Sequence, residues 1–337
     1  MAQAELAYQV AVEEHAAALV TADDLLAAGV RRAKVLWLKA QSLQRVGDYT
    51  QAGTVLRQAA GLVEAEREQG RAAERHPAGP VVTALLRDND AVLRPEHWRA
   101  APDGLIHAAT PGDGEGSLVA ALMNARCAAR RGDWHAYDQA MRPIEAVRAR
   151  DVAWDGVAAC ERVQRSLDHA WPKPPDDLHL LRADAIRALL AFKAMDNVPG
   201  QVRARTQLAR VLLAQDDVAG CYAQIERARS LLAGLGDPAI LRLQAGLDWV
   251  HGEADLNGQA GKAEPASQVL ARAEQAYQST GEAWHLACVR VRLAQAGRML
   301  HPPGPAVQHV LHAALTFDAC GDAARYAYCV ELLRAWC

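Results

Sequence analysis

The sequence predicts an all-α protein, an α-solenoid of stacked helix-turn-helix hairpins. Two observations of composition and one of periodicity support this. Alanine supplies 71 of the 337 residues, whereas isoleucine, threonine and phenylalanine supply only five, eight and two. Alanine has the highest helix propensity and lets helices approach closely, while a β-sheet needs the β-branched and aromatic residues that are scarce here. The third observation is a helix-ending signal that recurs along the second half of the chain.

This signal is a large apolar residue followed, four and five positions later, by a turn residue and a capping residue. Its copies end at positions 197, 237, 282 and 322, which are 40, 45 and 40 residues apart. Glycine ends a helix in the left-handed conformation, and the acidic residue after it favours the start of the next helix. The four copies are Phe192-x-x-x-Asp196-Asn197, Leu232-x-x-x-Gly236-Asp237, Tyr277-x-x-x-Gly281-Glu282 and Phe317-x-x-x-Gly321-Asp322.

Between two signals the apolar periodicity predicts two helices, a helix A followed by a helix B. In the first such unit, helix A covers Gln201 to Ala214 and helix B covers Ala219 to Leu232. The turn between them is Gln215-Asp216-Asp217. A period of about 40 residues with two helices per unit is typical of solenoid architectures.

A more recognisable hairpin lies upstream, from Leu36 to Ala59. Its helix A contains a small residue, its turn reads Gly-Asp-Tyr, and its helix B carries a small-large-small series. These residues are Ala40, then Gly47, Asp48 and Tyr49, then Ala52, Leu56 and Ala59. The pattern resembles the tetratricopeptide repeat. Lys39 and Leu43 depart from it, because an apolar and an aromatic residue are usual at those positions.

Two further copies follow the same register. Residues 121–134 repeat the turn as Gly132-Asp133-Trp134, with Ala125 at the small position of helix A and Tyr137 where alanine is usual. Residues 203–233 form another copy with Ala209 at the small position. The longer units after residue 237 resemble those in the C-terminal arrays of large bacterial transcription activators.

Helix-breaking segments divide the chain into four parts. Residues 1–70 are expected to hold N-terminal hairpins, and residues 71–117 an irregular insertion with a short helix from Val81 to Leu93. Residues 118–171 hold a hairpin and a following helix, and residues 178–337 the C-terminal array. The Pro- and Gly-rich stretches at 75–80 and 110–117 and the segment Trp171-Pro172-Lys173-Pro174-Pro175 set these boundaries.

Charge and cysteine usage restrict the function classes. The formal net charge is −3, so no positive surplus is available for phosphates, and direct nucleic-acid binding is not expected. No apolar run approaches the length of a membrane span, and the N-terminus carries no signal-peptide pattern. The seven cysteines occur singly and are expected as small buried residues in a reducing compartment. These features predict a cytoplasmic protein without a membrane partner.

Motifs for catalysis, cofactors and metals are weak. Gly258-Gln259-Ala260-Gly261-Lys262 superficially resembles a phosphate-binding loop, but its glycines are too close and no Ser or Thr follows Lys262. His309 and His312 share a helix face without an acidic residue at helical spacing. The acidic pairs at 23–24, 176–177 and 216–217 are interpreted as residues at helix starts. We therefore expect no cofactor, no metal and no catalytic set.

The resemblance to tetratricopeptide repeats implies that the A helices line a concave surface that binds a peptide or protein. The register places eleven residues there: Trp37, Gln41, Gln44, Arg126, Arg130, Arg203, Arg210, Gln244, His251, His285 and Arg292. The arginines suit an acidic segment or a C-terminal carboxylate, which guanidinium groups bind in a bidentate geometry. Compositional bias is the competing explanation, because 32 of the 37 basic residues are arginine.

The leading hypothesis is a non-catalytic protein- or peptide-binding module. It acts either as a scaffold in a larger assembly or as the sensor part of a regulatory system, namely a transcription regulator whose DNA-binding and ATPase parts are absent from this chain. The alternative hypothesis is an enzyme on a helical array with a site near residues 70–117, because long irregular segments are often functional. The sequence indicates neither the partner nor the oligomeric state.

Overall fold

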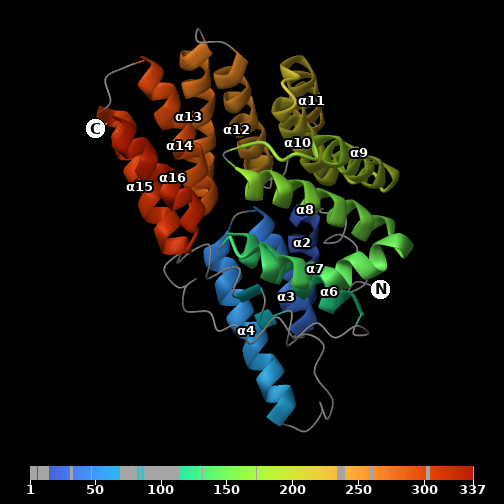
Figure 1. Ribbon diagram of the computed structural model, residues 1–337. Coiled ribbons are helices and arrows are strands. Elements are labelled where there is room, and N and C mark those ends of the chain that lie inside the picture. The colour runs from blue at the N-terminus through green and yellow to red at the C-terminus, as the bar shows by residue number, and fades with distance from the viewer. Residues whose placement is uncertain are drawn as a thin grey trace. The chain divides into compact units, whose positions relative to one another are not determined.

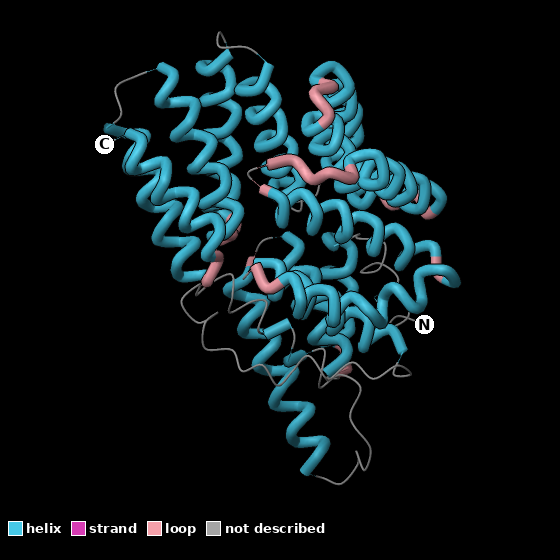
Figure 2. The backbone as a smooth tube through the Cα atoms, in the orientation of Figure 1, coloured by secondary structure: helices cyan, strands magenta, loops and turns pink. Residues whose placement is uncertain are grey.

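A computed structural model confirms the all-α prediction. It describes residues 6, 15–30, 33–46, 48–68, 82–83, 85–86, 114–130, 132–171, 173–233, 240–258, 262–300 and 304–336. Within these ranges every regular element is a helix (Figure 2). The helices follow one another as antiparallel hairpins joined by short turns (Figure 1), so the fold is an α-solenoid of stacked tetratricopeptide-like hairpins.

The chain forms two compact units. The first comprises residues 1–147 with 237–239, and the second comprises residues 148–236 with 240–337. The division falls between Val147 and Arg148, so the helix from Val152 to Ala170 belongs to the same unit as the helices that follow it. The described helices of the first unit are α2 (His15–Ala27), α3 (Ala33–Val46), α4 (Tyr49–Glu68), α6 (Gly114–Arg130) and α7 (Trp134–Val147).

The second unit begins with the short 3₁₀ helix η3 (Arg148–Arg150) and continues as hairpins. Its helices are α8 (Val152–Ala170), α9 (Leu178–Ala194), α10 (Val198–Ala214), α11 (Val218–Leu232), α12 (Ile240–Gly258), α13 (Ala263–Ser279), α14 (Ala283–Leu300), α15 (Gly304–Cys320) and α16 (Ala323–Trp336). We call α8, α10, α12, α14 and α16 the A helices. Helices α8, α10, α12 and α14 pack against one another in succession as well as against their hairpin partners.

The predicted turns are confirmed. Helix α3 ends at Val46 and α4 begins at Tyr49, although Gly47 itself lies outside the described residues. Helix α6 ends at Arg130 and α7 begins at Trp134, and residues 215–217 separate α10 from α11. Gly132, Gly281 and Gly321 have φ angles of 68°, 72° and 78°, so each occupies the left-handed conformation that the helix-ending signal requires. Asp196 and Asp216 take the same conformation without glycine, at φ 51° and 61°. The signal at Gly236 lies outside the described residues.

Capping side chains then start the next helix. Asn197 accepts a hydrogen bond from the backbone N–H of Gly200 at 2.7 Å, and Asp217 accepts one from Gly220 at 2.8 Å. Asp177 also stands at the N-cap position of α9, although its side chain makes no capping hydrogen bond. The prediction was wrong for Asp23 and Asp24, which lie inside α2, where Asp23 pairs with Lys39 of α3.

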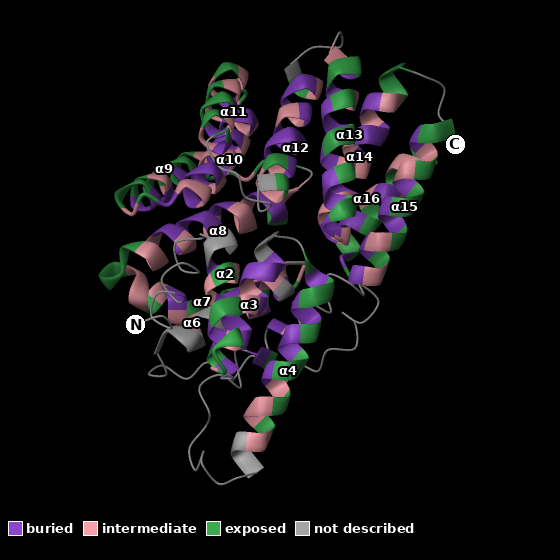
Figure 3. Ribbon diagram, turned by 180° about the vertical axis from the view of Figure 1, so that it is seen from behind, coloured by how far each residue is buried: buried purple, intermediate pink, exposed green. Residues whose placement is uncertain are grey.

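Small residues allow the close helix packing that the composition indicated. Ala40, Ala125 and Ala209 are completely buried at the equivalent positions of their hairpins. Gly200 lies so close to Phe192 that a Cβ atom there would approach the ring within 2.5 Å. Buried residues follow the contacts between neighbouring helices, whereas exposed residues follow the outer sides of α9 and α11 (Figure 3).

The cysteines that the structure describes fit the prediction of small buried residues. Cys160, Cys221, Cys288, Cys320 and Cys329 are buried free thiols. Burial raises the pKa of Cys221 to about 12, so this thiol is protonated and unreactive at neutral pH. None of the described helices is both long and apolar enough to cross a membrane. Of the predicted helix from Val81 to Leu93, only four positions lie within the described residues, and these are helical.

Candidate binding surface on the A helices

Three arginines predicted for the binding surface each bind a carboxylate on the preceding A helix. Arg203 of α10 donates to Glu161 of α8 at 2.7 Å, and Arg210 of α10 donates to Asp168 of α8 at 2.7 Å. In the same way Arg292 of α14 donates to Glu253 of α12 at 2.6 Å. The partners are 42, 42 and 39 residues apart, which matches the repeat period. We call these three ion pairs the ladder.

The ladder is well shielded from water. The side chains of Arg210 and Asp168 are only 12% and 8% exposed, so each charge depends on the other for stabilisation. Burial alone would lower the pKa of Arg210, but the attraction and the hydrogen bond of Asp168 outweigh burial and raise this pKa. The guanidinium also lies over the ring of Trp249 on α12, 5.4 Å from its centroid. Arg210 therefore connects three successive A helices.

A second cluster joins the first and last A helices of this unit. Arg325 of α16 donates to the backbone oxygen of Asp168 at 2.8 Å and to the carboxylate of Asp322 at 2.7 Å. Its guanidinium lies between the rings of Trp171 and Trp284, at 5.3 and 4.7 Å from their centroids. Trp171 follows α8 directly, and the hydrogen bond from Arg325 to Asp168 links positions that are 157 residues apart.

Trp171 also packs against two other side chains of the A helices. Its ring meets that of Tyr328 edge to face at 4.6 Å, and Arg292 stacks on it at 5.6 Å. We call these contacts around Trp171 the Trp171 cluster. Because Arg292 and Asp168 are also members of the ladder, two of the three ion pairs of the ladder are connected to this cluster. The arginines and carboxylates of the ladder and the cluster neutralise one another pairwise.

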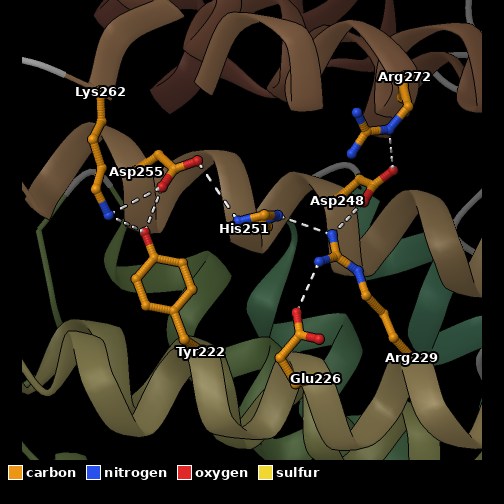
Figure 4. A network of polar contacts seen from close by, with 8 residues as sticks. All are labelled: Tyr222, Glu226, Arg229, Asp248, His251, Asp255, Lys262 and Arg272. Carbon is orange, nitrogen blue, oxygen red and sulfur yellow. Dashed lines mark hydrogen bonds and ion pairs between the residues drawn. The ribbon is translucent and has the colours of Figure 1, made fainter. Parts of the chain in front are cut away.

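Another polar network joins α11 to α12 and reaches α13 (Figure 4). At its centre, Nδ1 of His251 lies 2.9 Å from the guanidinium of Arg229, and Nε2 of His251 lies 3.7 Å from Asp255. Burial lowers the pKa of His251, and the positive charge of Arg229 lowers it further, against the attraction of Asp255. A neutral imidazole fits this geometry, because Nδ1 must be unprotonated to accept the hydrogen bond from Arg229.

At each end of this network a buried carboxylate meets an exposed basic side chain. Tyr222 donates to Asp255, and Lys262 donates to the Tyr222 oxygen at 3.2 Å. At the other end Asp248 accepts from both Arg229 and Arg272. In Figure 4, Tyr222 and Arg229 rise from α11 toward the acidic side chains of α12. The network holds α12 against α11, and His251 has a structural role in it.

A cavity of about 420 Å³ lies at the C-terminal ends of three A helices. Its walls come from the last turns of α12, α14 and α16. The ladder residues Glu253 and Arg292 are among the lining residues, so the cavity adjoins the ladder. Its volume falls within the range of small-ligand sites, which is roughly 300–1,000 Å³.

The other predicted surface residues take varied positions. Trp37 is buried in the first unit, and the side-chain oxygen of Gln41 is buried with no hydrogen-bond partner among the described residues. Gln44 is also buried and donates to the backbone oxygen of Leu85 at 3.0 Å. Arg126 is half-buried on α6, and Arg130 is the last residue of that helix. These residues belong to the first unit and the ladder to the second.

In the second unit, the offsets used for the longer repeats select Gln244, His251 and His285, none of which belongs to the ladder. Gln244 is exposed on α12, and it lies 7 residues before His251 in the sequence, which puts both on one side of that helix. His285 stacks on Tyr277 at 5.1 Å and lies 2.6 Å from Glu282. The structure therefore brings Arg203, Arg210 and Arg292 into the ladder but places His251 in the α11–α12 network.

The carboxylates of the ladder were not predicted. Glu161, Asp168 and Glu253 are acidic residues in helix A, and helical periodicity alone assigns them to solvent. A search for acidic residues one repeat period before each arginine would have found them, because the interval is 39 to 42 residues in all three pairs. No group of three or more His, Cys, Asp or Glu side chains within the described ranges is arranged to hold a metal ion.

Comparison with known proteins gives a similarity in fold only. No protein-family profile and no curated protein matches the chain. A solved structure of a Rap protein complexed with competence and sporulation factor is similar, with a TM-score of 0.51 and 10% sequence identity. The match covers 99% of this chain and 96% of that chain. The similarity therefore extends over nearly the whole chain and concerns the fold alone.

Proposed function

We propose that this protein is a non-catalytic module that binds a peptide or protein segment on its A helices and acts in regulation. The observation that carries this proposal is the alignment of polar and aromatic side chains on successive A helices, ending in an open cavity at α12, α14 and α16. Stacked hairpins present such a face continuously, which suits an extended ligand.

Two further observations support binding over catalysis. Several titratable groups on the A helices are engaged with one another, as Arg210 is with Asp168 and Arg325 with Asp322. Burial raises the pKa of Cys288 and Cys329, so these thiols lack nucleophilic character at neutral pH. The alternative site near residues 70–117 falls almost wholly outside the described residues, and no observation favours it.

The fold comparison adds support for a regulatory role. The similar Rap protein was solved in complex with competence and sporulation factor, so a chain of this architecture and length binds a factor. A scaffold would keep one conformation with and without its partner, whereas a sensor would change conformation when its ligand binds. The Trp171 cluster favours the sensor, because it joins α8, the first A helix of the second unit, to α16, the last one.

The proposal is tested by screening random peptide pools against the full chain. A binding pool should raise the melting temperature in a concentration-dependent manner. Ligand at 100 times Kd adds about 2.7 kcal/mol to the free energy of unfolding. Hydrogen–deuterium exchange should then show protection on α10, α12 and α14, with α9, α11 and α13 as internal controls. Protection confined to the B helices or to residues 70–117 contradicts the proposal, and so does the absence of any binding pool.

A further inference from the structure

The cavity at the ends of α12, α14 and α16 is lined by residues of two chemical kinds, and we call the apolar ones the apolar wall and the polar ones the polar wall. The apolar wall contains Leu256, Met299, Leu332 and Trp336. Met299 is 50% exposed although it lies beside the cavity, so a large apolar surface faces solvent there. An occupant with an apolar group would remove this surface from water and gain roughly 25 cal/mol for each Å² buried.

The polar wall contains only one charge that is not already neutralised by a described residue. Glu253 and Arg292 neutralise each other at 2.6 Å, and Arg292 also donates to the side-chain oxygen of Gln295 at 2.9 Å. Gln295 in turn donates to the hydroxyl of Tyr328. Arg298 lines the same cavity, is exposed, and has no ion pair with any described residue. It offers five N–H donors in a planar fork that matches a carboxylate.

Arg298 also has a purely structural explanation, which sets the control for any experiment. It lies in the last turn of α14, where a positive charge offsets the negative end of the helix dipole. Arg334 does the same in the last turn of α16, and it is equally exposed but does not line the cavity. The two arginines are therefore matched in helix position and differ in access to the cavity.

We infer that the cavity binds the C-terminal residue of a peptide, with the apolar side chain against Met299 and Trp336 and the α-carboxylate on Arg298. This inference rests on the proposed function and names the chemistry of its ligand. A C-terminal residue carries an apolar side chain and a carboxylate on the same Cα atom, as the two walls require. An internal Asp or Glu would bring a carboxylate without the apolar group.

The test uses labelled dodecapeptide pools with random sequence and a fixed last residue. One pool ends in leucine with a free carboxylate, a second ends in leucine amide, and a third ends in glycine with a free carboxylate. The full chain should retain the first pool about tenfold better than either of the others, because a hydrogen-bonded charge and an apolar contact are each lost. Octanoate serves as a small amphipathic acid in a parallel measurement.

Variants locate the effect. Arg298→Gln should abolish the preference for the free carboxylate, and Arg298→Lys should restore part of it, because lysine keeps the charge without the bidentate geometry. Arg334→Gln should bind all pools as the unchanged protein does. Circular dichroism checks that each variant folds.

The possible failures are distinguishable. Equal retention of the acid and amide pools, or a preference that survives Arg298→Gln, overturns this inference while leaving peptide binding in place. Octanoate binding that needs Arg298, without any preference among peptide pools, also overturns it, since the ligand is then a small acid. If no pool binds at all, the proposed function falls with it.

Discussion

The ion pair between Asp168 and Arg210 should be a major determinant of stability in the second unit. Replacing Asp168 by leucine leaves the guanidinium of Arg210, which is only 12% exposed, without its carboxylate. Unit charges about 4 Å apart attract by roughly 4 kcal/mol at an effective dielectric constant of 20, and breaking one partner of a buried pair costs about 3–5 kcal/mol. We therefore expect Asp168→Leu to reduce the free energy of unfolding by about 3–5 kcal/mol.

A double-mutant cycle separates this cost from the value of the pair itself. Replacing both residues, as Asp168→Leu with Arg210→Met, removes the uncompensated charge and should recover most of the loss, because apolar replacements of buried pairs are often neutral. The backbone oxygen of Asp168 remains available to Arg325 in both variants. Urea unfolding followed by circular dichroism gives the midpoints and the slopes.

An exposed ion pair provides the matched control. Glu226 lies 3.1 Å from Arg229 but is 68% exposed, so Glu226→Gln should change the free energy of unfolding by less than about 1 kcal/mol. The reasoning is refuted if Asp168→Leu costs no more than this control. It is also refuted if the double variant loses as much as the sum of its single changes.

Two further predictions concern packing and pH. Ala125→Leu should lower the urea midpoint by the equivalent of about 1–3 kcal/mol, because Ala125 is fully buried, while the exposed Ala324→Leu should leave it nearly unchanged. The pKa of His251 is lowered in the folded chain, so the unfolded chain binds a proton at a higher pH than the folded chain does. The contribution of His251 to stability is therefore present at neutral pH and is lost as pH falls below about 6.5. His251→Gln keeps an acceptor for Arg229 and should flatten this slope between pH 5 and 7; an unchanged slope contradicts the assignment.

The hairpins were predictable because their signals are local. A turn such as Gly132-Asp133-Trp134 needs only one left-handed residue and one capping side chain, and both are visible within three positions. The small positions Ala40 and Ala125 were predictable for a similar reason, since the repeat fixes their offset from the turn. Helix bounds shifted by a few residues at most, as at Val198, where Asn197 caps the helix earlier than the apolar pattern indicated.

The candidate site was only partly predictable because its contacts are distant in the sequence. The register placed Arg203, Arg210 and Arg292 on the A helices but could not show that each meets a carboxylate of the preceding hairpin. The sequence placed Trp171 only in a helix-breaking segment, yet Trp171 packs on Tyr328 of α16. No local pattern indicates such a contact, because it depends on how several hairpins stack.

The ladder changes what recognition of an acidic ligand requires. An external carboxylate at Arg203 or Arg210 must displace Glu161 or Asp168, which are held at 2.7 Å, are largely buried and belong to the same chain. The displaced carboxylate would remain buried without a partner, and that cost opposes binding. Arg298 has no such competitor among the described residues, and it stands at the edge of the cavity where solvent already reaches it. A negatively charged ligand therefore meets less competition at Arg298 than at Arg203 or Arg210, whereas the arginines of the ladder join successive A helices to one another.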